Sequence, residues 1–322
     1  MENLQKLVLL FVKEKKDISQ SSAMAYAKNL KRINTLYTKS EKFSYKDLGY
    51  LLTDYKNVIK LVDENYTNPS TNRNFINSIL VYVQIKHADP KVIDAYTITR
   101  DKNAKIYEDG ANTKSDKVKD NWITLEQYDA LIDKLYNEIK TDGLFERDCK
   151  GAVEFFKLQD LVLLMFYRNY PIRNDLADMQ VFTAFEYKKH ADDKTNNYLV
   201  IRKDKFEIVL NVYKTSKVYD TLTFDITYKD NPRLFKLIRR LLEFNDTGYF
   251  IVNKNMEPIT PNQLSKNITG IFYKHLKKKV GTTMIRDITL TEKFSDKNKE
   301  QETMSKIMGN SIRTQNMVYI KK

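Results

Sequence analysis

The segment from Phe155 to Tyr167 constrains the fold more than any other part of this sequence, because it is strongly apolar and long enough for a helix. It reads F-F-K-L-Q-D-L-V-L-L-M-F-Y, and Pro171 follows where such a helix would end. A helix that is apolar on most faces has to be covered by other elements. The sequence therefore predicts a buried helix inside a second domain.

Residues 1–100 carry apolar side chains at three-to-four spacing, which predicts a helical domain. Serines at positions 19–22 can cap the second helix, and Pro69 marks the start of the fourth. The predicted helices cover residues 4–12, 22–36, 45–62 and 70–83, with a short further helix at 92–96. Residues 101–121 are charged and nearly free of large apolar side chains, so we interpret them as an inter-domain linker.

The second predicted domain, residues 122–322, mixes helices with strands. Thr124 and Gln127 form a capping box, and Thr260 caps a further helix start. Alternating apolar residues predict strands at 198–201, 206–212 and 218–226. The expected fold is a mainly α N-terminal domain plus an α+β domain with a small antiparallel sheet.

The composition excludes several classes of protein. One cysteine, Cys149, and three scattered histidines leave no disulfide framework and no zinc site. The sequence has no nucleotide-binding loop, so no cofactor is predicted. It also lacks an apolar run long enough for a membrane span. The N-terminus carries Glu2 and Lys6 and lacks a cleavage site, which favours an intracellular protein over a secreted one.

The net charge of +13 and pI of about 9.3 indicate a polyanionic partner. Nucleic acid is the main hypothesis; an AT-rich genome that inflates lysine and asparagine is the alternative. Candidate DNA-binding residues lie on polar helix faces, although such faces are often only solvated. They are Lys28, Arg32, Arg73, Lys274, Lys277 and Lys278.

Four residues of the second domain suit attack on a phosphodiester: Arg173, Lys214, Arg286 and Tyr319. A phenol is a competent nucleophile, and it would give a phosphotyrosine that preserves the energy of the broken bond. Two guanidiniums can hold the non-bridging oxygens, and a lysine on a hairpin can protonate the departing 5′-oxygen. This chemistry requires neither metal nor ATP.

This pattern resembles the tyrosine recombinase (phage-integrase) family. Arg173 matches its first arginine, Lys214 its hairpin lysine and Arg286 its second arginine, while Asn310 precedes Tyr319 by nine residues, as the family's second histidine does. The resemblance implies double-stranded DNA as partner and a 3′-phosphotyrosyl intermediate. It also implies an N-terminal domain that clamps DNA, and a homotetramer that exchanges strands through a Holliday junction.

The sequence departs from the family at both histidines, which are replaced by Thr283 and Asn310. Neither side chain can transfer a proton near neutral pH, but both can hydrogen-bond a phosphate. Thr283 is therefore a further candidate, as is Lys217, which competes with Lys214. The segments around Arg173 and Lys214 look most like integrases of virophages and large DNA viruses. That similarity suggests the host cytoplasm, the nucleus or the virion as the location.

Two other functions stay open. The first is a recombinase-derived DNA-binding protein that has lost catalysis, which the two missing histidines allow. The second is a type IB topoisomerase-like enzyme, which uses similar residues to relax supercoils without site choice. A covalent protein–DNA adduct would argue against the first, and sequence-specific binding against the second.

Overall fold

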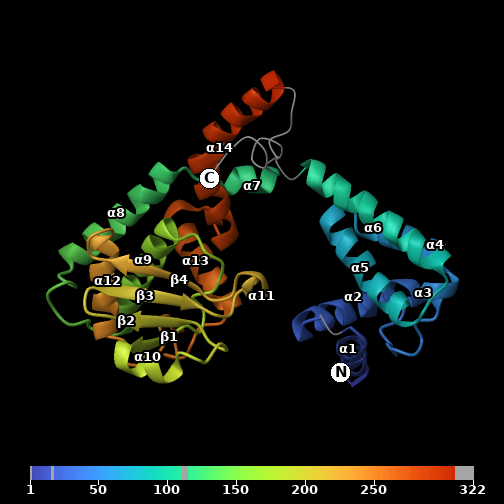
Figure 1. Ribbon diagram of the computed structural model, residues 1–322, viewed down its shortest axis with the longest axis horizontal. Helices are drawn as coiled ribbons and strands as arrows, with labels where there is room; N and C mark the ends of the chain where they lie inside the picture. The colour runs from blue at the N-terminus through green and yellow to red at the C-terminus, as the bar shows by residue number, and fades with distance from the viewer. Residues whose placement is uncertain (1, 16–17, 111–114, 309–322) are drawn as a thin grey trace. The chain divides into compact units, whose positions relative to one another are not determined.

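The computed structural model describes residues 2–15, 18–110 and 115–308; for 295, 296 and 298–308 it describes the backbone alone. The chain divides into two compact units, Met1–Ser115 and Asp116–Lys322 (Figure 1). Within the described residues no helix is both long enough and apolar enough to cross a membrane.

The first unit consists of helices joined by loops, with no strand among its described residues, as the apolar spacing predicts. Ser19 caps its second helix by accepting a hydrogen bond from the Ser22 backbone, and the buried Tyr96 hydroxyl donates to the Leu51 carbonyl at 2.9 Å. The first bond is local to the start of its helix, and the second joins residues 45 positions apart within the core. The helices are α1 (Glu2–Glu14), α2 (Gln20–Thr38), α3 (Tyr50–Thr53), α4 (Tyr55–Asn65), α5 (Pro69–Ile85) and α6 (Pro90–Gly110).

One helix prediction for this unit was wrong in its bounds. The helix expected over residues 45–62 is split at Asp54, whose carboxylate accepts the Tyr37 hydroxyl at 2.7 Å. The residues expected to form the inter-domain linker, 101–121, are helical over most of their described length, since α6 continues to Gly110 and Asn121 ends a further helix. The division between the two units, after Ser115, falls inside this range, and its role as a linker stays a prediction. Asn103 anchors this part of α6 by donating to the Asn72 side chain at 3.0 Å. High charge therefore does not indicate a non-helical segment, since charged residues also suit exposed helix faces.

The second unit combines helices with one sheet. The predicted capping box at Thr124 and the predicted cap at Thr260 are both present, and the cap at Thr260 is also a capping box. The helices are α7 (Asp116–Asn121), α8 (Leu125–Thr141), α9 (Ala152–Asn169), α10 (Ala184–His190), α11 (Ser216–Tyr219), α12 (Pro232–Glu243), α13 (Pro261–Leu276) and α14 (Thr282–Met308), and the strands are β1 (Gln180–Thr183), β2 (Tyr198–Ile201), β3 (Lys205–Leu210) and β4 (Leu222–Thr227).

The sheet has the order β1-β2-β3-β4 and is mixed. The three predicted strands form its antiparallel part, while β1 pairs parallel to β2 and was missed. With the short sequence Q-V-F-T, β1 offers little alternation to detect. Residues 218 and 219, expected in a strand, belong instead to α11. The fold class, a helical domain plus an α+β domain with a small sheet, is confirmed with this change.

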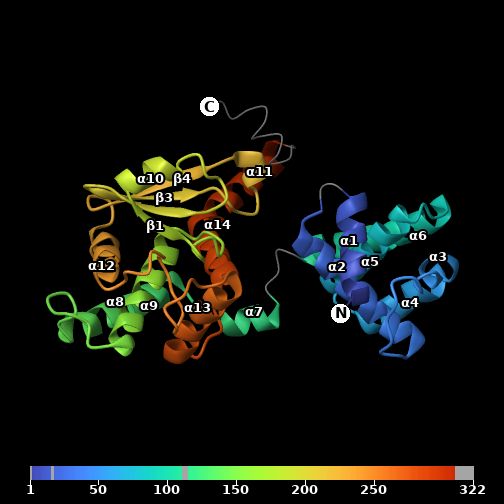
Figure 2. The ribbon, with the colours of Figure 1, turned by 90° about the horizontal axis from the view of Figure 1, so that it is seen from below.

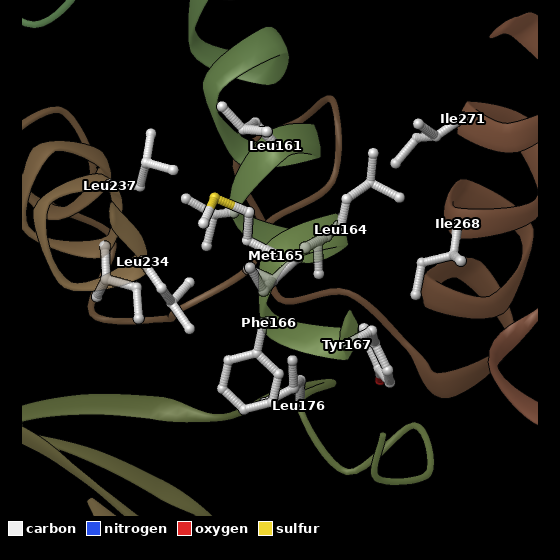
Figure 3. Packing of buried hydrophobic residues seen from close by; sticks show 14 of the residues in the cluster. Leu161, Leu164, Met165, Phe166, Tyr167, Leu176, Leu234, Leu237, Ile268 and Ile271 are labelled. Atoms are coloured by element: carbon white, nitrogen blue, oxygen red, sulfur yellow. The ribbon is translucent and has the colours of Figure 1, made fainter. Parts of the chain in front are cut away.

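The apolar helix α9 is the centre of the second unit, as predicted (Figure 3). Leu161, Leu164 and Phe166 are fully buried. Leu234 and Leu237 of α12 lie on one side of α9, and Ile268 and Ile271 of α13 on the other. In Figure 2, α9 and α12 lie on one side of the sheet and α10 on the other. Both faces of β2 are therefore covered, which explains why its residues 198–200 are all buried.

Candidate functional site

Arg173 lies in the loop that follows α9, and its side chain is exposed. The buried Tyr167 hydroxyl donates to the Arg173 carbonyl at 2.8 Å, which fixes the loop to the end of the core helix. Burial raises the pKa of Tyr167 well above its usual range, so this phenol is a structural hydrogen-bond donor. The backbone that carries the first arginine is therefore anchored to the core.

Arg286 lies near the start of α14, and that helix start is joined to the Arg173 loop. The buried Thr282 hydroxyl donates to the Asn174 side chain at 2.8 Å. Through this bond the two arginine-bearing segments, far apart in the sequence, meet within one site. The structure thus brings together the two segments that carry the arginines singled out by the sequence pattern.

Asp175 lies within electrostatic reach of both arginines and was not among the predicted site residues. Burial raises the pKa of its carboxyl, while the positive charges of Arg173 and Arg286 oppose that rise. Among the described residues, neither arginine has a carboxylate within ion-pair distance. One carboxylate facing two guanidiniums at a distance leaves an excess of positive charge there.

The guanidinium of Arg286 is incompletely satisfied. Its Nη2 donates to the Thr283 hydroxyl at 3.2 Å, but its Nη1 is buried and has no hydrogen-bond partner among the described residues. The neighbouring Asp287 is exposed and makes no ion pair with Arg286 among the described residues. A buried guanidinium N–H without an acceptor suits an anion such as a phosphate oxygen.

Lys214 and Lys217 are both exposed on the connection between β3 and β4. Lys214 precedes the short helix α11 and Lys217 lies in it, so the structure leaves the choice between them open. The connection is closed on itself by two hydrogen bonds. Tyr213 donates to the Asp220 carbonyl, and Thr221 donates to the Asn211 side chain, both at 2.7 Å.

The base of this connection is joined to the arginine loop by Asn197, which sequence reasoning missed. Its side-chain Nδ2 donates to the carbonyl of Asp175 at 3.1 Å and to that of Val212 at 3.0 Å. Its Oδ1 accepts from the backbone N–H groups of Asn211 and Val212. An asparagine before a short strand gives no pattern to detect. For Asp175, the one signal was its place two residues after Arg173.

Tyr319 and Asn310 lie outside the described residues, so their predicted roles stay predictions. Thr283 is exposed and contacts Arg286 as described above. The described part of the candidate site therefore consists of Arg173, Asp175, Thr283 and Arg286, with Lys214 on an adjoining connection.

The candidate DNA-binding residues of the first unit occupy two helices. Lys28 and Arg32 are exposed one turn apart on α2. Arg73 on α5 is partly buried, with its guanidinium carbon 5.3 Å from the ring centre of Tyr107. Its Nε is buried without a hydrogen-bond partner in the described part of the chain. Lys28 and Arg32 are thus free to meet a phosphate, whereas Arg73 also has a packing role.

The three candidate lysines of the second unit differ in surroundings. Lys274 is exposed and lines a cavity of about 1070 Å³ between α8, α9 and α13. Lys277 ends α13 in the left-handed conformation and is exposed. Lys278 donates to the Asp120 carbonyl at the end of α7. Lys278 therefore holds α7, which makes it the weakest of the three as a phosphate contact.

No group of three potential metal ligands occurs among the described residues. No family model matches this sequence, and no curated protein matches it. Among solved structures, the chain is similar to the XerH site-specific recombinase bound to its palindromic difH substrate in a post-cleavage complex. That comparison has 11% sequence identity and a TM-score of 0.39, and it covers 100% of this chain and 94% of the other. A TM-score at this level carries no argument about function.

Proposed function

We propose that this protein breaks and rejoins DNA as a tyrosine recombinase. The observation that carries the proposal is a candidate phosphate site: the segments of Arg173 and Arg286 are joined, and Arg286 has a buried guanidinium N–H without a hydrogen-bond partner among the described residues. The step from phosphate binding to cleavage rests on the predicted Tyr319 and Lys214. Two guanidiniums without ion-pair partners among the described residues match the needs of a phosphodiester whose negative charge grows during attack. The strongly basic chain agrees with a nucleic-acid substrate.

In the proposed reaction, the Tyr319 hydroxyl oxygen forms a bond to the scissile phosphorus and its proton leaves to water. The bond from phosphorus to the 5′-oxygen breaks, and the Lys214 ammonium gives that oxygen a proton. Arg173, Arg286 and Asn310 hold the phosphate through the transition state. The product is a 3′-phosphotyrosyl link, which a free 5′-hydroxyl reverses to rejoin the strand. No oxidant, metal or ATP enters this balance.

We further propose that four copies of the protein act on two DNA duplexes through a Holliday junction. We propose that they do so inside a cell that carries a virus or another mobile element. The virophage or large-virus assignment rests on the short segments around Arg173 and Lys214. The assembly and the origin are the finer parts of this proposal, and the first experiment does not depend on them.

The test is covalent trapping. The protein is incubated with a pool of Holliday junctions and nicked duplexes, and DNA that stays attached is resolved on denaturing gels. We expect an adduct with the wild type and none with Tyr319→Phe. Binding without an adduct would refute cleavage and favour the catalytically silent DNA-binding protein. An adduct together with relaxation of supercoils irrespective of sequence would instead favour the topoisomerase-like enzyme.

A further inference from the structure

The buried side chain of Asn197 occupies the junction between the two segments that carry Arg173 and Lys214. Asn197 is 6% exposed, and every hydrogen bond that the structure records for its side chain is made with a backbone group. Its Nδ2 bonds two carbonyls, one in each segment, and its Oδ1 accepts two N–H groups of the connection. A buried amide in which both ends are satisfied holds its partners in one arrangement.

The partners of Asn197 decide what it positions. Asp175 lies two residues after Arg173, and Val212 lies two residues before Lys214. Beyond Val212 the connection has few anchors: the partly buried Tyr213 packs against the core and bonds within the connection, and α11 is a single short turn. Asn211 ties the connection to the 193–196 loop through the Asn196 carbonyl at 2.9 Å, but it does not touch the arginine loop in the described contacts. Among the described hydrogen bonds, Asn197 is therefore the link between the lysine and the arginines.

We infer that Asn197 is a positioning residue for the leaving-group proton transfer: it holds the Lys214 connection in register with the arginine loop. This inference rests on the proposed function, since it assigns Lys214 the role of general acid. Asn197 itself touches no substrate in this account. Its loss lets the exposed connection drift, and a general acid that is displaced by about 1 Å transfers its proton much more slowly.

The substitution that isolates this role is Asn197→Asp. It keeps the oxygen that accepts from Asn211 and Val212 but places a second oxygen against the carbonyls of Asp175 and Val212. The matched control is Asn245→Asp. Asn245 is 8% exposed and also donates to backbone carbonyls, at 2.7 Å to Tyr249, but it makes no described contact with the lysine connection. Both variants lose a buried amide donor, so a purely structural effect would appear in both.

The decisive assay compares two nicked substrates: a normal phosphodiester and one with sulfur in place of the bridging 5′-oxygen. Sulfur leaves as a thiolate and needs little help from an acid, because a thiol is far more acidic than an alcohol. We expect Asn197→Asp to cleave the normal substrate about 100-fold more slowly than wild type, within the range for loss of a general acid. On the sulfur substrate we expect Asn197→Asp to cleave within about threefold of the wild-type rate. Lys214→Ala, which removes the general acid itself, should show the same recovery. Asn245→Asp should show no such difference between the substrates.

An equal deficit of Asn197→Asp on both substrates, or wild-type cleavage of the normal one, would overturn the inference. A second measurement works even if the wild type cleaves neither substrate, which would refute the proposed function. Brief trypsin digestion followed by mass spectrometry gives the rate of cutting after Lys214 and Lys217. We expect faster cutting there in Asn197→Asp than in wild type or Asn245→Asp, and unchanged rates would count against the positioning role.

Discussion

Replacing Arg286 by methionine should stabilise the free protein while abolishing its proposed reaction. The reason is the buried Nη1 of Arg286, which has no hydrogen-bond partner among the described residues. A buried donor left unsatisfied costs about 1–3 kcal/mol. Methionine has a similar length and helix propensity, so the backbone of α14 should tolerate it.

The magnitude follows from what the substitution removes. It relieves the unsatisfied donor, worth about 2 kcal/mol at the middle of the usual range. It also removes the 3.2 Å bond to the exposed Thr283 and the attraction of the Asp175 carboxylate, which together are worth about 1 kcal/mol. The net expectation is a gain of about 1 kcal/mol in the free energy of unfolding, or roughly 2–4 °C in Tm for a unit of this size.

The single tryptophan, Trp122, packs against the core of the second unit, so urea unfolding followed by its fluorescence reports on that unit. The matched control is Arg240→Met. Arg240 donates to the carbonyls of Leu144 and Arg147 and pairs with Glu243. Its removal should therefore destabilise the unit by about 2–4 kcal/mol. If Arg286→Met lowers the free energy of unfolding by more than about 1 kcal/mol, the unsatisfied guanidinium does not destabilise the folded protein and the reasoning is refuted.

Three further outcomes are expected. Asp160→Asn should flatten the pH dependence of stability. Burial raises the pKa of Asp160 from 3.8 to about 7, although the charge of Lys274 opposes the rise. The stabilising contribution of the protonated Asp160 carboxyl is therefore present below pH 4 and lost as pH rises through 7. From pH 5 to pH 8, urea unfolding should show that wild type loses about 2 kcal/mol more of its free energy of unfolding than the variant does, once solvent screening from the adjoining cavity is allowed for. Equal changes in the two proteins would contradict this. Leu164→Ala should cost about 2–5 kcal/mol in the Trp122-monitored unfolding, because Leu164 is fully buried on α9. Replacing Lys28 and Arg32 by acidic residues should reduce the slope of log affinity for DNA against log salt concentration by about 2. The same change at Lys60, which is paired with Glu64 on α4, should leave that slope unchanged.

Local patterns in the sequence predicted the elements that carry their own signals. The apolar run of α9, the capping boxes at Thr124 and Thr260, and the alternation in β3 all required no knowledge of distant partners. Strand β1 and the break at Asp54 depend on contacts made by other parts of the chain. The first needs β2 as its partner, and the second needs the hydroxyl of Tyr37.

The candidate site was predictable as a set of residue types but not as a geometry. Arg173 and Arg286 stood out because they matched a known pattern. Their meeting depends on the bond from Thr282 to Asn174, which joins segments that no local pattern relates. Asn197 and Asp175 were missed for the same reason, since their importance lies in what they touch.

The unsatisfied guanidinium of Arg286 also bears on whether the protein cuts DNA or merely binds it. A buried N–H without an acceptor opposes folding, and a phosphate oxygen would remove that penalty on binding. Both an active recombinase and a catalytically silent DNA-binding protein gain from this, so the arginines argue for a phosphate ligand and not for cleavage. Thr283, whose hydroxyl is the one recorded hydrogen-bond partner of the Arg286 side chain among the described residues, cannot serve as a base near neutral pH. Cleavage therefore depends on Tyr319 and on a correctly placed lysine. Two observations separate an active recombinase from a silent DNA-binding protein: the covalent adduct itself, and a slower formation of that adduct when Asn197 is replaced.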